Sequence, residues 1–304
     1  MRVWSDGALV EAEQAAASPL SHGLHYGTGV FEGIRAYPTA DGPAIFRLDA
    51  HLARLGRGAE ALGMDPPGPG VDLVGLHRGC VEVLAASGMA SAYLRPLVYY
   101  GTGGLGLDVA PLQVRRMVAA IPWNNHLGEG IGQGVRIALS PWRRNPARSL
   151  PPLKLCGNYV NSILAKLDAT RRGFEEALFI DGQNCVVECT GENVFMVQGG
   201  RVTAVAHDDA LPGITRDTLL GLSGGVSRII DLEELLGADE VFLTGTSAEV
   251  TPVAELEGRT WSPGPVTREL QALYLDIVHG RSAAHHGWLT WLSGAQGQTL
   301  ASSA

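Results

Sequence analysis

The chain contains only two lysines, Lys154 and Lys166, and arginine takes the place of lysine everywhere else. A lysine amine can lose its proton, act as a nucleophile and form a Schiff base, which a guanidinium cannot do. The rarity of lysine therefore makes each of the two a candidate for chemistry. Lys154 follows the Pro151-Pro152 break, in an apolar run that is predicted to be a short strand just before a helix.

Helical periodicity separates the two lysines. Asn158 stands at an N-cap position and Gly173 at a position where a helix can end. Lys166 falls off the apolar face of this predicted helix and is expected at the solvated surface. For Lys154 two interpretations stay open: a strand-end lysine that reaches solvent, or a reactive amine beside a helix N-terminus. The apolar face repeats at helical spacing and consists of Val160, Ile163, Leu164 and Leu167.

Two arginines and one helix start are candidates for anion binding. Arg95 lies within the apolar run 92–100, so it is either paired in the core or presented to an anionic ligand. Arg54 lies on a helix that Asp49 is predicted to cap, and it has the ordinary interpretation of a solvated helix arginine. The run 211–217 opens another helix, and the free N–H groups of a helix start form an anion site.

Two glycine-containing runs match known site motifs, but neither is flanked by the secondary structure that its motif requires. Residues 101–106 fit G-x-G-x-x-G after a strand, yet a dinucleotide fold needs a helix next. Pro111 intervenes instead, and 113–121 is predicted to be a strand. Residues 221–225 fit the nucleophile pattern G-x-S-x-G, which needs a strand before it and a helix after it. Helix-like residues precede this run, so neither a nicotinamide site nor a hydrolase site is favoured.

Composition narrows the class of protein. At 304 residues the chain has room for about two domains, and its apolar fraction of 45% supports a sizeable core. A net charge of -8 and a pI near 5.6 argue against nucleic acid or an anionic membrane as a partner. No apolar run approaches the roughly 18 residues of a membrane helix, and the N-terminus has no signal-peptide core. The four cysteines lack zinc-ligand spacing, so we expect no metal and reduced thiols in the cytoplasm.

The predicted elements fall into two groups, and we predict an α/β (α+β) protein of two domains. The small N-terminal α/β domain (1–122) has a hairpin over 1–20 that turns at Asp6-Gly7, a strand at 44–48, helices after Asp49 and at 73–86, and strands at 92–100 and 113–121. Residues 123–134 are aperiodic and glycine-rich and form the predicted linker. The larger domain (135–304) has strands at 135–139, 176–180, 185–189, 194–197, 202–205 and 239–249, with helices opening near 158, 211 and 266.

Several separated segments together are similar to one family. They are 25–37, 92–96, 157–162, 188–195, 211–217 and 244–252, and they span most of the chain. The sequence closely resembles branched-chain amino acid aminotransferases, within the fold type IV group of pyridoxal 5'-phosphate enzymes. The run Phe31-Glu32-Gly33-Ile34-Arg35, with Arg95, resembles the branched-chain branch. D-amino acid transaminases and aminodeoxychorismate lyases usually differ there.

The resemblance implies pyridoxal 5'-phosphate as the cofactor. Lys154 would carry it as an imine and then move the proton between substrate Cα and cofactor C4′, which requires a lowered lysine pKa. Glu188 would keep the pyridine nitrogen protonated, so that the ring is an electron sink. Tyr159 would hydrogen-bond the phenolic oxygen. The remaining cofactor contacts, mainly around the phosphate, would come from Arg54, Leu211, the backbone of Ile214 and Thr215, and the Thr246 hydroxyl.

The resemblance also assigns a substrate pocket. Its wall would be formed by Tyr26, Phe31, Gly33 and Trp123. Arg95 would bind the γ-carboxylate of glutamate, which would explain an arginine inside an apolar strand. The substrate α-carboxylate would be bound by Tyr93 with the backbone of Thr246 and Ser247, assisted by Arg35.

The implied function is reversible amino transfer between L-leucine, L-isoleucine or L-valine and 2-oxoglutarate. The implied architecture is a larger domain with a pseudo-barrel β core, the cofactor between the two domains, and at least a homodimer. Two alternatives remain: a fold type IV enzyme of other specificity (a D-amino acid or amine transaminase, or aminodeoxychorismate lyase), or a non-catalytic binding protein.

Three features depart from the family pattern. His126 stands where many relatives have a tyrosine, which bears on substrate range. The pair Leu155-Cys156 is bulkier than usual, and Cys156 suggests the hypothesis that activity is sensitive to oxidation. The segment 221–231 is shorter by about five residues, which is expected to alter a surface element.

Overall fold

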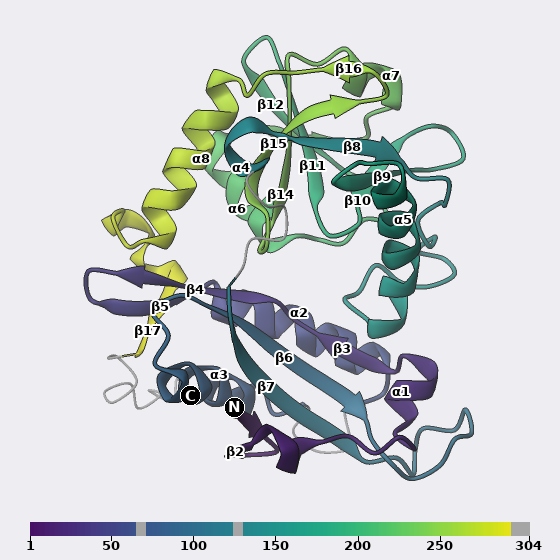
Figure 1. Cartoon of the computed structure of the whole chain (residues 1–304), viewed down its shortest axis with the longest axis vertical. Helices are drawn as coiled ribbons and strands as arrows, with labels where there is room; N and C mark the ends of the chain where they lie inside the picture. The colour runs from purple at the N-terminus through teal and green to yellow at the C-terminus, as the bar shows by residue number, and fades with distance from the viewer. Residues whose placement is uncertain (65–70, 124–129, 293–304) are drawn as a thin grey trace, which may run out of the picture. The chain divides into compact units, whose positions relative to one another are not determined.

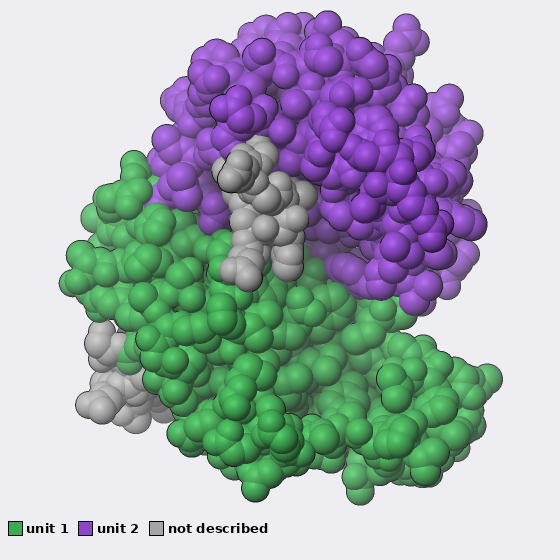
Figure 2. All heavy atoms as spheres, viewed as in Figure 1, with its two compact units in different colours: residues 1–124, 154–157, 276–304 green, residues 125–153, 158–275 purple. Residues whose placement is uncertain are grey.

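The computed structural model describes residues 1–64, 71–123 and 130–292. The chain divides into two compact units, each described here by itself (Figure 2). Unit 1 comprises Met1–Asn124, Lys154–Gly157 and Asp276–Ala304, and unit 2 comprises Asn125–Leu153 and Asn158–Leu275. The short segment with Lys154 therefore belongs to the same unit as the N-terminal part of the chain, although it lies far along the sequence.

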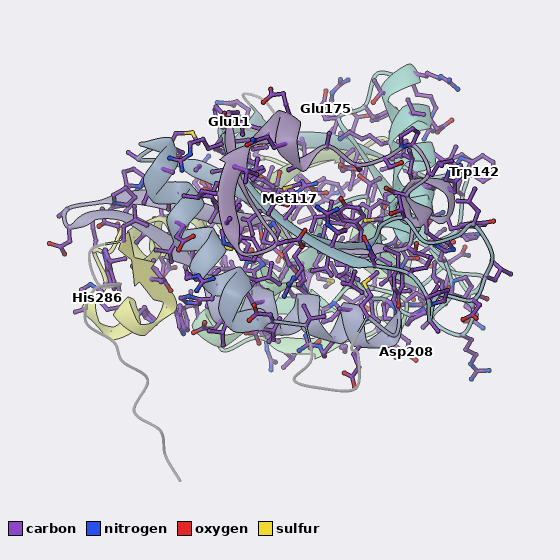
Figure 3. The ribbon with its side chains drawn as sticks, turned by 90° about the horizontal axis from the view of Figure 1, so that it is seen from below. Glu11, Met117, Trp142, Glu175, Asp208 and His286 are labelled. Atoms are coloured by element: carbon purple, nitrogen blue, oxygen red, sulfur yellow. The ribbon has the colours of Figure 1, made fainter. Side chains whose placement is uncertain are left out.

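Unit 1 is built on an antiparallel sheet with the order β17-β5-β4-β6-β7-β1-β2, in which β3 also pairs with β6 (Figure 1). The hairpin predicted over 1–20 is confirmed, with Ser5 opposite Ala8 across the turn. Met117 lies within this sheet on β7, whereas the exposed Glu11 lies at the end of an edge strand (Figure 3). The strands are β1 (Arg2–Ser5), β2 (Ala8–Glu11), β3 (Gly29–Phe31), β4 (Ile34–Thr39), β5 (Gly42–Phe46), β6 (Ala92–Tyr100), β7 (Val114–Pro122) and β17 (Leu289–Trp291).

Two helices of unit 1 pack on its sheet. Helix α3 (Leu73–Ser87) contacts β1, β6 and β7, and α2 (Leu48–Ala61) contacts β3 and α3. The short α1 (His22–Tyr26) precedes β3. The prediction that Asp49 caps α2 is wrong: Arg47 is the N-cap residue, and Asp49 lies in the first turn. The apolar residues of α2 recur at helical spacing and are buried, namely Leu48, Leu52, Leu55 and Ala59.

Unit 2 contains a mixed sheet with the order β10-β9-β8-β15-β14-β11-β12-β13, in which β16 pairs with β15. The pairs β8–β9, β8–β15 and β12–β13 are parallel, and the remaining described pairs are antiparallel. The strands are β8 (Val135–Leu139), β9 (Glu176–Ile180), β10 (Val186–Cys189), β11 (Asn193–Gln198), β12 (Arg201–Val205), β13 (Val226–Arg228), β14 (Glu240–Gly245), β15 (Glu249–Leu256) and β16 (Arg259–Thr260).

This second sheet curls. The edge strand β10 contacts β11 and β12, which stand near the opposite end of the strand order. One core cluster inside the curl includes Ile137 and Leu178 together with apolar residues of β10, β11, β14 and β15. Successive residues of a strand point to opposite faces, so Ala177 and Phe179 pack outside the curl with Ala165 and Ala169 of helix α5. Strand β9 is buried along its whole length because both of its faces are covered.

The helices of unit 2 lie outside the curled sheet. They are α4 (Gly130–Gln133), α5 (Tyr159–Arg171), α6 (Ile214–Ser223), α7 (Leu232–Leu236) and α8 (Pro265–Val278), whose last residues are assigned to unit 1. Helix α5 packs on β8 and β9, and α6 packs on β12 and β14 (Figure 1). Trp142 and Asp208 are exposed on unit 2 (Figure 3).

Helix α5 presents the opposite face from the one predicted. Its buried side is formed by the small residues Ser162, Ala165 and Ala169. The four apolar residues expected to face the core are instead exposed: Val160 by 59%, Ile163 by 56%, Leu164 by 40% and Leu167 by 47%. Periodicity correctly located an apolar stripe, but it cannot specify what covers that stripe.

The two motif runs lie in contexts that exclude the readings they suggest. Residues 101–106 connect β6 to its antiparallel neighbour β7, so no helix follows them. Residues 221–225 form the end of α6, where Gly224 adopts a left-handed C-cap conformation. Within the described ranges, no helix is both long and apolar enough to cross a membrane.

Candidate active site

Main-chain bonds hold the segment 154–157 against the start of β3. The Phe31 N–H donates to the Lys154 carbonyl at 3.2 Å, and the Gly157 N–H donates to the Gly27 carbonyl at 3.1 Å. A Cβ on Gly27, whose φ is +66°, would lie 2.8 Å from the Cα of Gly157, so the approach requires glycine there. The predicted strand around Lys154 is reduced to an isolated bridge between Leu155 and Val30.

One face of the unit 1 sheet collects four of the predicted substrate residues. Arg35 on β4 is directly opposite Tyr93 on β6, and alternation puts Arg95 on the same face of β6. Phe31 on β3 is opposite Leu97 of β6, which extends this face along the strand. The strand register therefore assembles Phe31, Arg35, Tyr93 and Arg95 from three strands.

Cations and aromatic rings alternate across this face, which we call the cation–ring layer. The Lys154 Nζ lies 5.1 Å from the ring centroid of Phe31, and the Arg95 guanidinium lies 4.9 Å from the same ring. The Tyr93 ring is 5.3 Å from Arg95 and stacks on Trp123 at 5.2 Å. Arg35 lies 4.3 Å from the Trp123 ring and 4.4 Å from Tyr37. Such contacts favour cations at about 0.5–2 kcal/mol each.

Two details of the layer fit an anionic substrate. The Arg95 Nε is buried without a hydrogen-bond partner among the described residues, and an unmet buried donor is costly unless a ligand accepts from it. A Cβ on Gly33 would lie 1.7 Å from the Tyr93 hydroxyl oxygen. The absence of a side chain at Gly33 therefore allows that hydroxyl to lie directly over the β3–β4 turn.

Arg54 is a buried residue, so its ordinary interpretation as a solvated helix arginine is wrong. Its side chain is 5% exposed, and its Nε and Nη2 donate to Glu32 at 2.6 and 2.9 Å. The His51 ring nitrogen Nδ1 lies 2.7 Å from the same carboxylate. Glu32 follows Phe31 and faces α2, because successive strand residues alternate in direction.

Tyr26 makes its contacts with a different part of unit 1. Its hydroxyl donates to the Leu105 carbonyl at 2.8 Å, and its ring packs on His22 at 4.6 Å. Tyr26 as a whole is 48% exposed. These contacts tie the predicted pocket residue to the connection between β6 and β7.

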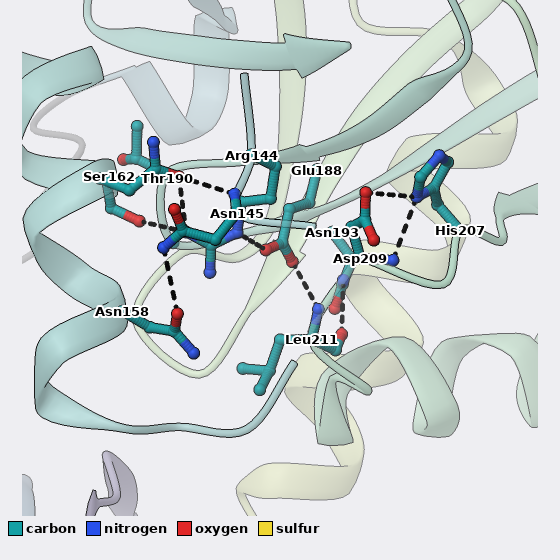
Figure 4. Close-up of polar contacts among 12 residues, drawn as sticks. Arg144, Asn145, Asn158, Ser162, Glu188, Thr190, Asn193, His207, Asp209 and Leu211 are labelled. Atoms are coloured by element: carbon teal, nitrogen blue, oxygen red, sulfur yellow. Dashed lines mark hydrogen bonds and ion pairs between the residues drawn. The ribbon is translucent and has the colours of Figure 1, made fainter. Parts of the chain in front are cut away.

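In unit 2, Glu188 at the end of β10 is buried and held at both carboxylate oxygens (Figure 4). Arg144 Nε lies 2.8 Å from Oε1, and the Leu211 N–H donates to Oε2 at 2.9 Å. Arg144 is buried as well and also donates to Asn161 and Ser162 of α5, each at 3.2 Å. A buried carboxylate needs such compensation because desolvation disfavours its charge.

Asn193 braces the turn that leads into α6. Its side-chain amide donates to the Leu211 carbonyl at 2.9 Å. A Cβ on Gly213, the N-cap residue of α6, would lie 1.9 Å from the Asn193 Oδ1. The N-cap residue Gly213 has no side chain with which to cap α6, and the first residues of the helix are the predicted phosphate contacts Ile214 and Thr215. The helix start therefore has the features of an anion site.

Tyr159, Thr246 and Ser247 also belong to unit 2. Tyr159 is the first residue of α5, and the preceding Asn158 donates to the carbonyls of residues 151 and 153 at 3.0 and 3.1 Å. Asn158 is the N-cap residue of α5, as predicted, but its side chain makes no cap bond because its amide donates to those two carbonyls instead. Thr246 and Ser247 lie in the turn between β14 and β15, and α6 packs on β14.

A second acidic cluster lies beside Glu188. Lys166 Nζ is 2.9 Å from the buried Glu176, so Lys166 is a half-buried ion-pair residue rather than the solvated lysine expected. Thr190 Oγ1 donates to the other oxygen of Glu176 at 2.6 Å. Burial and the neighbouring charge of Glu176 raise the pKa of Glu192 from 4.5 to about 8. Glu192 is therefore largely protonated at neutral pH.

Two features named from sequence remain. His126 lies outside the described residues. Burial raises the pKa of Cys156, which opposes formation of the reactive thiolate at neutral pH. Its sensitivity to oxidation stays a hypothesis.

The profile of the family described as Amino-transferase class IV matches residues 29–256. The chain belongs to this family.

This class IV aminotransferase is similar to branched-chain enzymes along nearly its full length. It is 40% identical to the branched-chain-amino-acid aminotransferase of Pseudomonas aeruginosa over 298 residues, covering 95% of this chain and 96% of the relative. It is 42% identical to the T.th. branched-chain amino acid aminotransferase solved with N-(5'-phosphopyridoxyl)-L-glutamate, at a TM-score of 0.88. That match covers 96% of this chain and 98% of the other.

A further structure of the T.th. enzyme contains 4-methylvaleric acid, with 42% identity, the same coverage and a TM-score of 0.88. These matches confirm the predicted family and the fold type IV architecture, a mixed α/β fold with two sheets of which one curls into a half-barrel.

Sequence reasoning missed several residues that the structure brings to these groups. Arg144 lies in an aperiodic loop, and no local pattern distinguishes it from its exposed neighbour Arg143. Glu32 could have been singled out from the sequence. An acidic residue within an apolar run needs a partner if it is buried, just as an arginine such as Arg95 does. Glu192, which follows Glu188 in an acidic turn, offered no local sign that its pKa is raised.

We predict that Glu192 makes stability fall as pH rises. Because its folded-state pKa lies above the unfolded value, its contribution is complete below about 4.5 and is lost as pH rises through about 8. Glu192→Gln cannot titrate. Chemical denaturation gives the free energy of unfolding of Glu192→Gln and of wild type at pH 5 and at pH 9. The value for Glu192→Gln minus the value for wild type should rise between these two pH values by on the order of 3 kcal/mol.

The matched control is Glu269→Gln, at an exposed position on α8, which should follow wild type at both pH values. A Glu192→Gln curve that stays parallel to wild type from pH 5 to pH 9 would contradict the raised pKa.

Proposed function

We propose that this class IV aminotransferase transfers an amino group between L-leucine, L-isoleucine or L-valine and 2-oxoglutarate, with pyridoxal 5'-phosphate as cofactor. One observation carries the proposal: an amine and two arginines lie against four aromatic rings in one layer. The chain that carries this layer is 42% identical to an enzyme solved with a phosphopyridoxyl-glutamate adduct. The same relative was solved with 4-methylvaleric acid, a branched apolar acid.

The residues present fit pyridoxal 5'-phosphate by their chemistry. The cofactor offers an aldehyde, a pyridine nitrogen, a phenolic oxygen and a phosphate. The chain offers an amine at Lys154, a buried carboxylate at Glu188, a phenol at Tyr159 and, for the phosphate, Arg54 with the uncapped start of α6. Leu211 lies just before the start of α6 in sequence, and Thr246 directly follows β14, the strand on which α6 packs. When bound, the pyridine ring supplies the sink for the electron pair left at the substrate Cα.

Lys154 would hold the cofactor and, once its amine is free, would act as the base. The amine would take the proton from the substrate Cα and return it at cofactor C4′. Its main chain is fixed to β3 by the Phe31 N–H, so the point from which the flexible side chain extends is fixed. The Phe31 ring lies beside Nζ.

Glu188 binds the proton on the pyridine nitrogen. Arg144 and the Leu211 N–H each use one lone pair of its carboxylate, and a carboxylate has about four acceptor positions. Glu188 can therefore accept from the pyridinium while its own orientation stays fixed. Tyr159 hydrogen-bonds the phenolic oxygen from the start of α5.

The cation–ring layer selects the substrate. Phe31, Gly33 and Trp123 form the wall that accepts an apolar side chain. Tyr26, whose contacts lie at the connection between β6 and β7, is assigned to the same wall by the family resemblance alone. Arg95 binds the γ-carboxylate of glutamate with the buried Nε that has no described protein acceptor. Tyr93, with Thr246 and Ser247, binds the α-carboxylate, and Arg35 assists from its stack between Tyr37 and Trp123.

The experiment that tests the reaction is an amino-donor screen with 2-oxoglutarate. L-leucine, L-isoleucine and L-valine should give the corresponding 2-oxo acids, and D-alanine or a primary amine should not. Transamination restricted to D-alanine or amines would reject the assignment, and so would lyase activity on aminodeoxychorismate without transamination.

We predict that Arg95→Met separates the two half-reactions. Losing a charge-assisted bond to the γ-carboxylate should raise the KM for L-glutamate by about 10- to 100-fold. The KM for L-leucine should change by less than about threefold, because its side chain carries no charge. Steady-state kinetics of each half-reaction gives both values.

Arg57→Met is the matched control, since Arg57 is an exposed arginine on α2 and its loss should leave both KM values unchanged. Equal increases for glutamate and leucine in Arg95→Met would show that Arg95 does not distinguish the substrates.

The proposal includes a second copy of this chain as partner. Support comes from α5, where four apolar side chains, Val160, Ile163, Leu164 and Leu167, are 40–59% exposed on one helix. Exposed apolar stripes of this kind mark association surfaces in soluble proteins. The four cysteines are free thiols in the structure, which supports a cytoplasmic location for the assembly.

We predict that Leu164→Asp weakens the homodimer by at least about 100-fold, because it places a charge within an apolar contact. Light scattering during size-exclusion chromatography should then report a monomer at micromolar concentration. Thr170→Asp adds the same charge to an exposed polar position of α5 and should leave the dimer intact. An unchanged dimer in Leu164→Asp would place the interface elsewhere.

A further inference from the structure

Two members of the buried group beneath the cation–ring layer, Glu32 and His51, have no role in the reaction described above, although Glu32 binds Arg54 and His51 binds Glu32. Glu32 is fully buried, His51 is 1% exposed and Arg54 is 4% exposed. All three belong to unit 1, Glu32 between β3 and β4 and the other two on α2. A buried carboxylate of this kind is expensive to maintain, so its partners explain what it does.

The acceptor positions of Glu32 are used within unit 1. Its Oε1 accepts from Arg54 Nε at 2.6 Å. Its Oε2 accepts from Arg54 Nη2 at 2.9 Å, from His51 at 2.7 Å and from the Gly33 N–H at 3.2 Å. Four donors of unit 1 bind this carboxylate, and its side chain is fully buried. Glu32 is therefore placed to act on a ligand through its neighbours and not by direct contact.

The protonation states keep this arrangement in place. Burial would raise the pKa of Glu32, but Arg54 and His51 hold it well below its ordinary value. Burial lowers the pKa of His51, and the charges of Arg54 and Lys154 act in the same direction against the opposing effect of Glu32. A neutral His51 that donates from Nδ1 to an ionised Glu32 satisfies both groups.

The bidentate pair fixes the orientation of Arg54. The guanidinium is planar, and its Nε–Nη2 edge is bound to Glu32, so the Nη1 edge points away from that carboxylate. A free arginine side chain populates many rotamers, and a ligand that fixes it must offset the loss of that freedom. Because folding already restricts Arg54, less of that freedom remains to be lost when a ligand binds.

We propose that Glu32, supported by His51, is the positioning residue that aims Arg54 at the cofactor phosphate. This inference rests on the proposed role of Arg54 in binding that phosphate. It adds that the acid in the run Phe31-Glu32-Gly33 is needed for phosphate affinity, although Glu32 itself touches neither cofactor nor substrate.

Two ligands that differ only in the phosphate test this inference. The cofactor-free protein is titrated with pyridoxal 5'-phosphate and with pyridoxal, and binding is followed by absorbance and by tryptophan fluorescence. Arg54→Met and Glu32→Gln should each weaken pyridoxal 5'-phosphate binding by about tenfold or more, as loss of an orienting partner does elsewhere. Both should change pyridoxal affinity by less than about twofold. Glu60→Gln, at an exposed carboxylate of α2, is the matched control and should bind both ligands as wild type does.

Glu32→Asp keeps the result decisive if Glu32→Gln does not fold. It retains the negative charge that Arg54 needs but shortens the side chain by one methylene, which draws the guanidinium back from its place. Circular dichroism establishes that each variant is folded before titration. The phosphate-selective loss should appear in Glu32→Asp as well.

The outcomes distinguish the inference about Glu32 from the proposed phosphate-binding role of Arg54. If Arg54→Met is phosphate-selective but the Glu32 variants weaken both ligands equally, or neither, then Glu32 is only structural and the inference fails while the proposed function stands. If Arg54→Met itself shows no preference for the phosphorylated ligand, the assignment of Arg54 fails and the inference fails with it.

Discussion

The hydrogen bond from the Phe31 N–H to the Lys154 carbonyl is the interaction on which the site in unit 1 depends. It joins residues that are far apart in sequence and places the Lys154 amine beside the Phe31 ring. The bond is possible because Gly27 and Gly157 approach more closely than any side chain would allow. Strand register then places the other strand residues of the cation–ring layer beside Phe31, because Arg35, Tyr93 and Arg95 occupy one face of β4 and β6.

Two neighbouring residues, the last residue of β3 and the one that follows it, have different roles. Phe31 faces the cation–ring layer, whereas Glu32 faces α2 and pairs with Arg54. Unit 2 uses a related solution, because its buried Glu188 is compensated by Arg144. In both units a carboxylate that would be costly to bury is held by an arginine. Each pair thereby fixes the direction of a group that we assign to the cofactor, Arg54 in one unit and Glu188 in the other.

Local patterns predicted the strands more accurately than the side-chain environments. The bounds of β6, β8 and β9 agree with the runs predicted from sequence, because alternating or continuous apolar residues are a local signal. The solvated readings of Arg54 and Lys166 were wrong, because their partners Glu32 and Glu176 come from other elements. The exposed stripe of α5 could not be read either, since periodicity reports which residues share a face and not what covers it. Resemblance to a family supplied residue roles that no spacing argument provides.

The most direct test uses the presence of only two lysines in the chain. The protein is incubated with pyridoxal 5'-phosphate, reduced with borohydride, digested and mapped by mass spectrometry. The account predicts a pyridoxyl group on the peptide that contains Lys154. A pyridoxyl group on Lys166, which the structure pairs with Glu176, or on neither lysine, would contradict it.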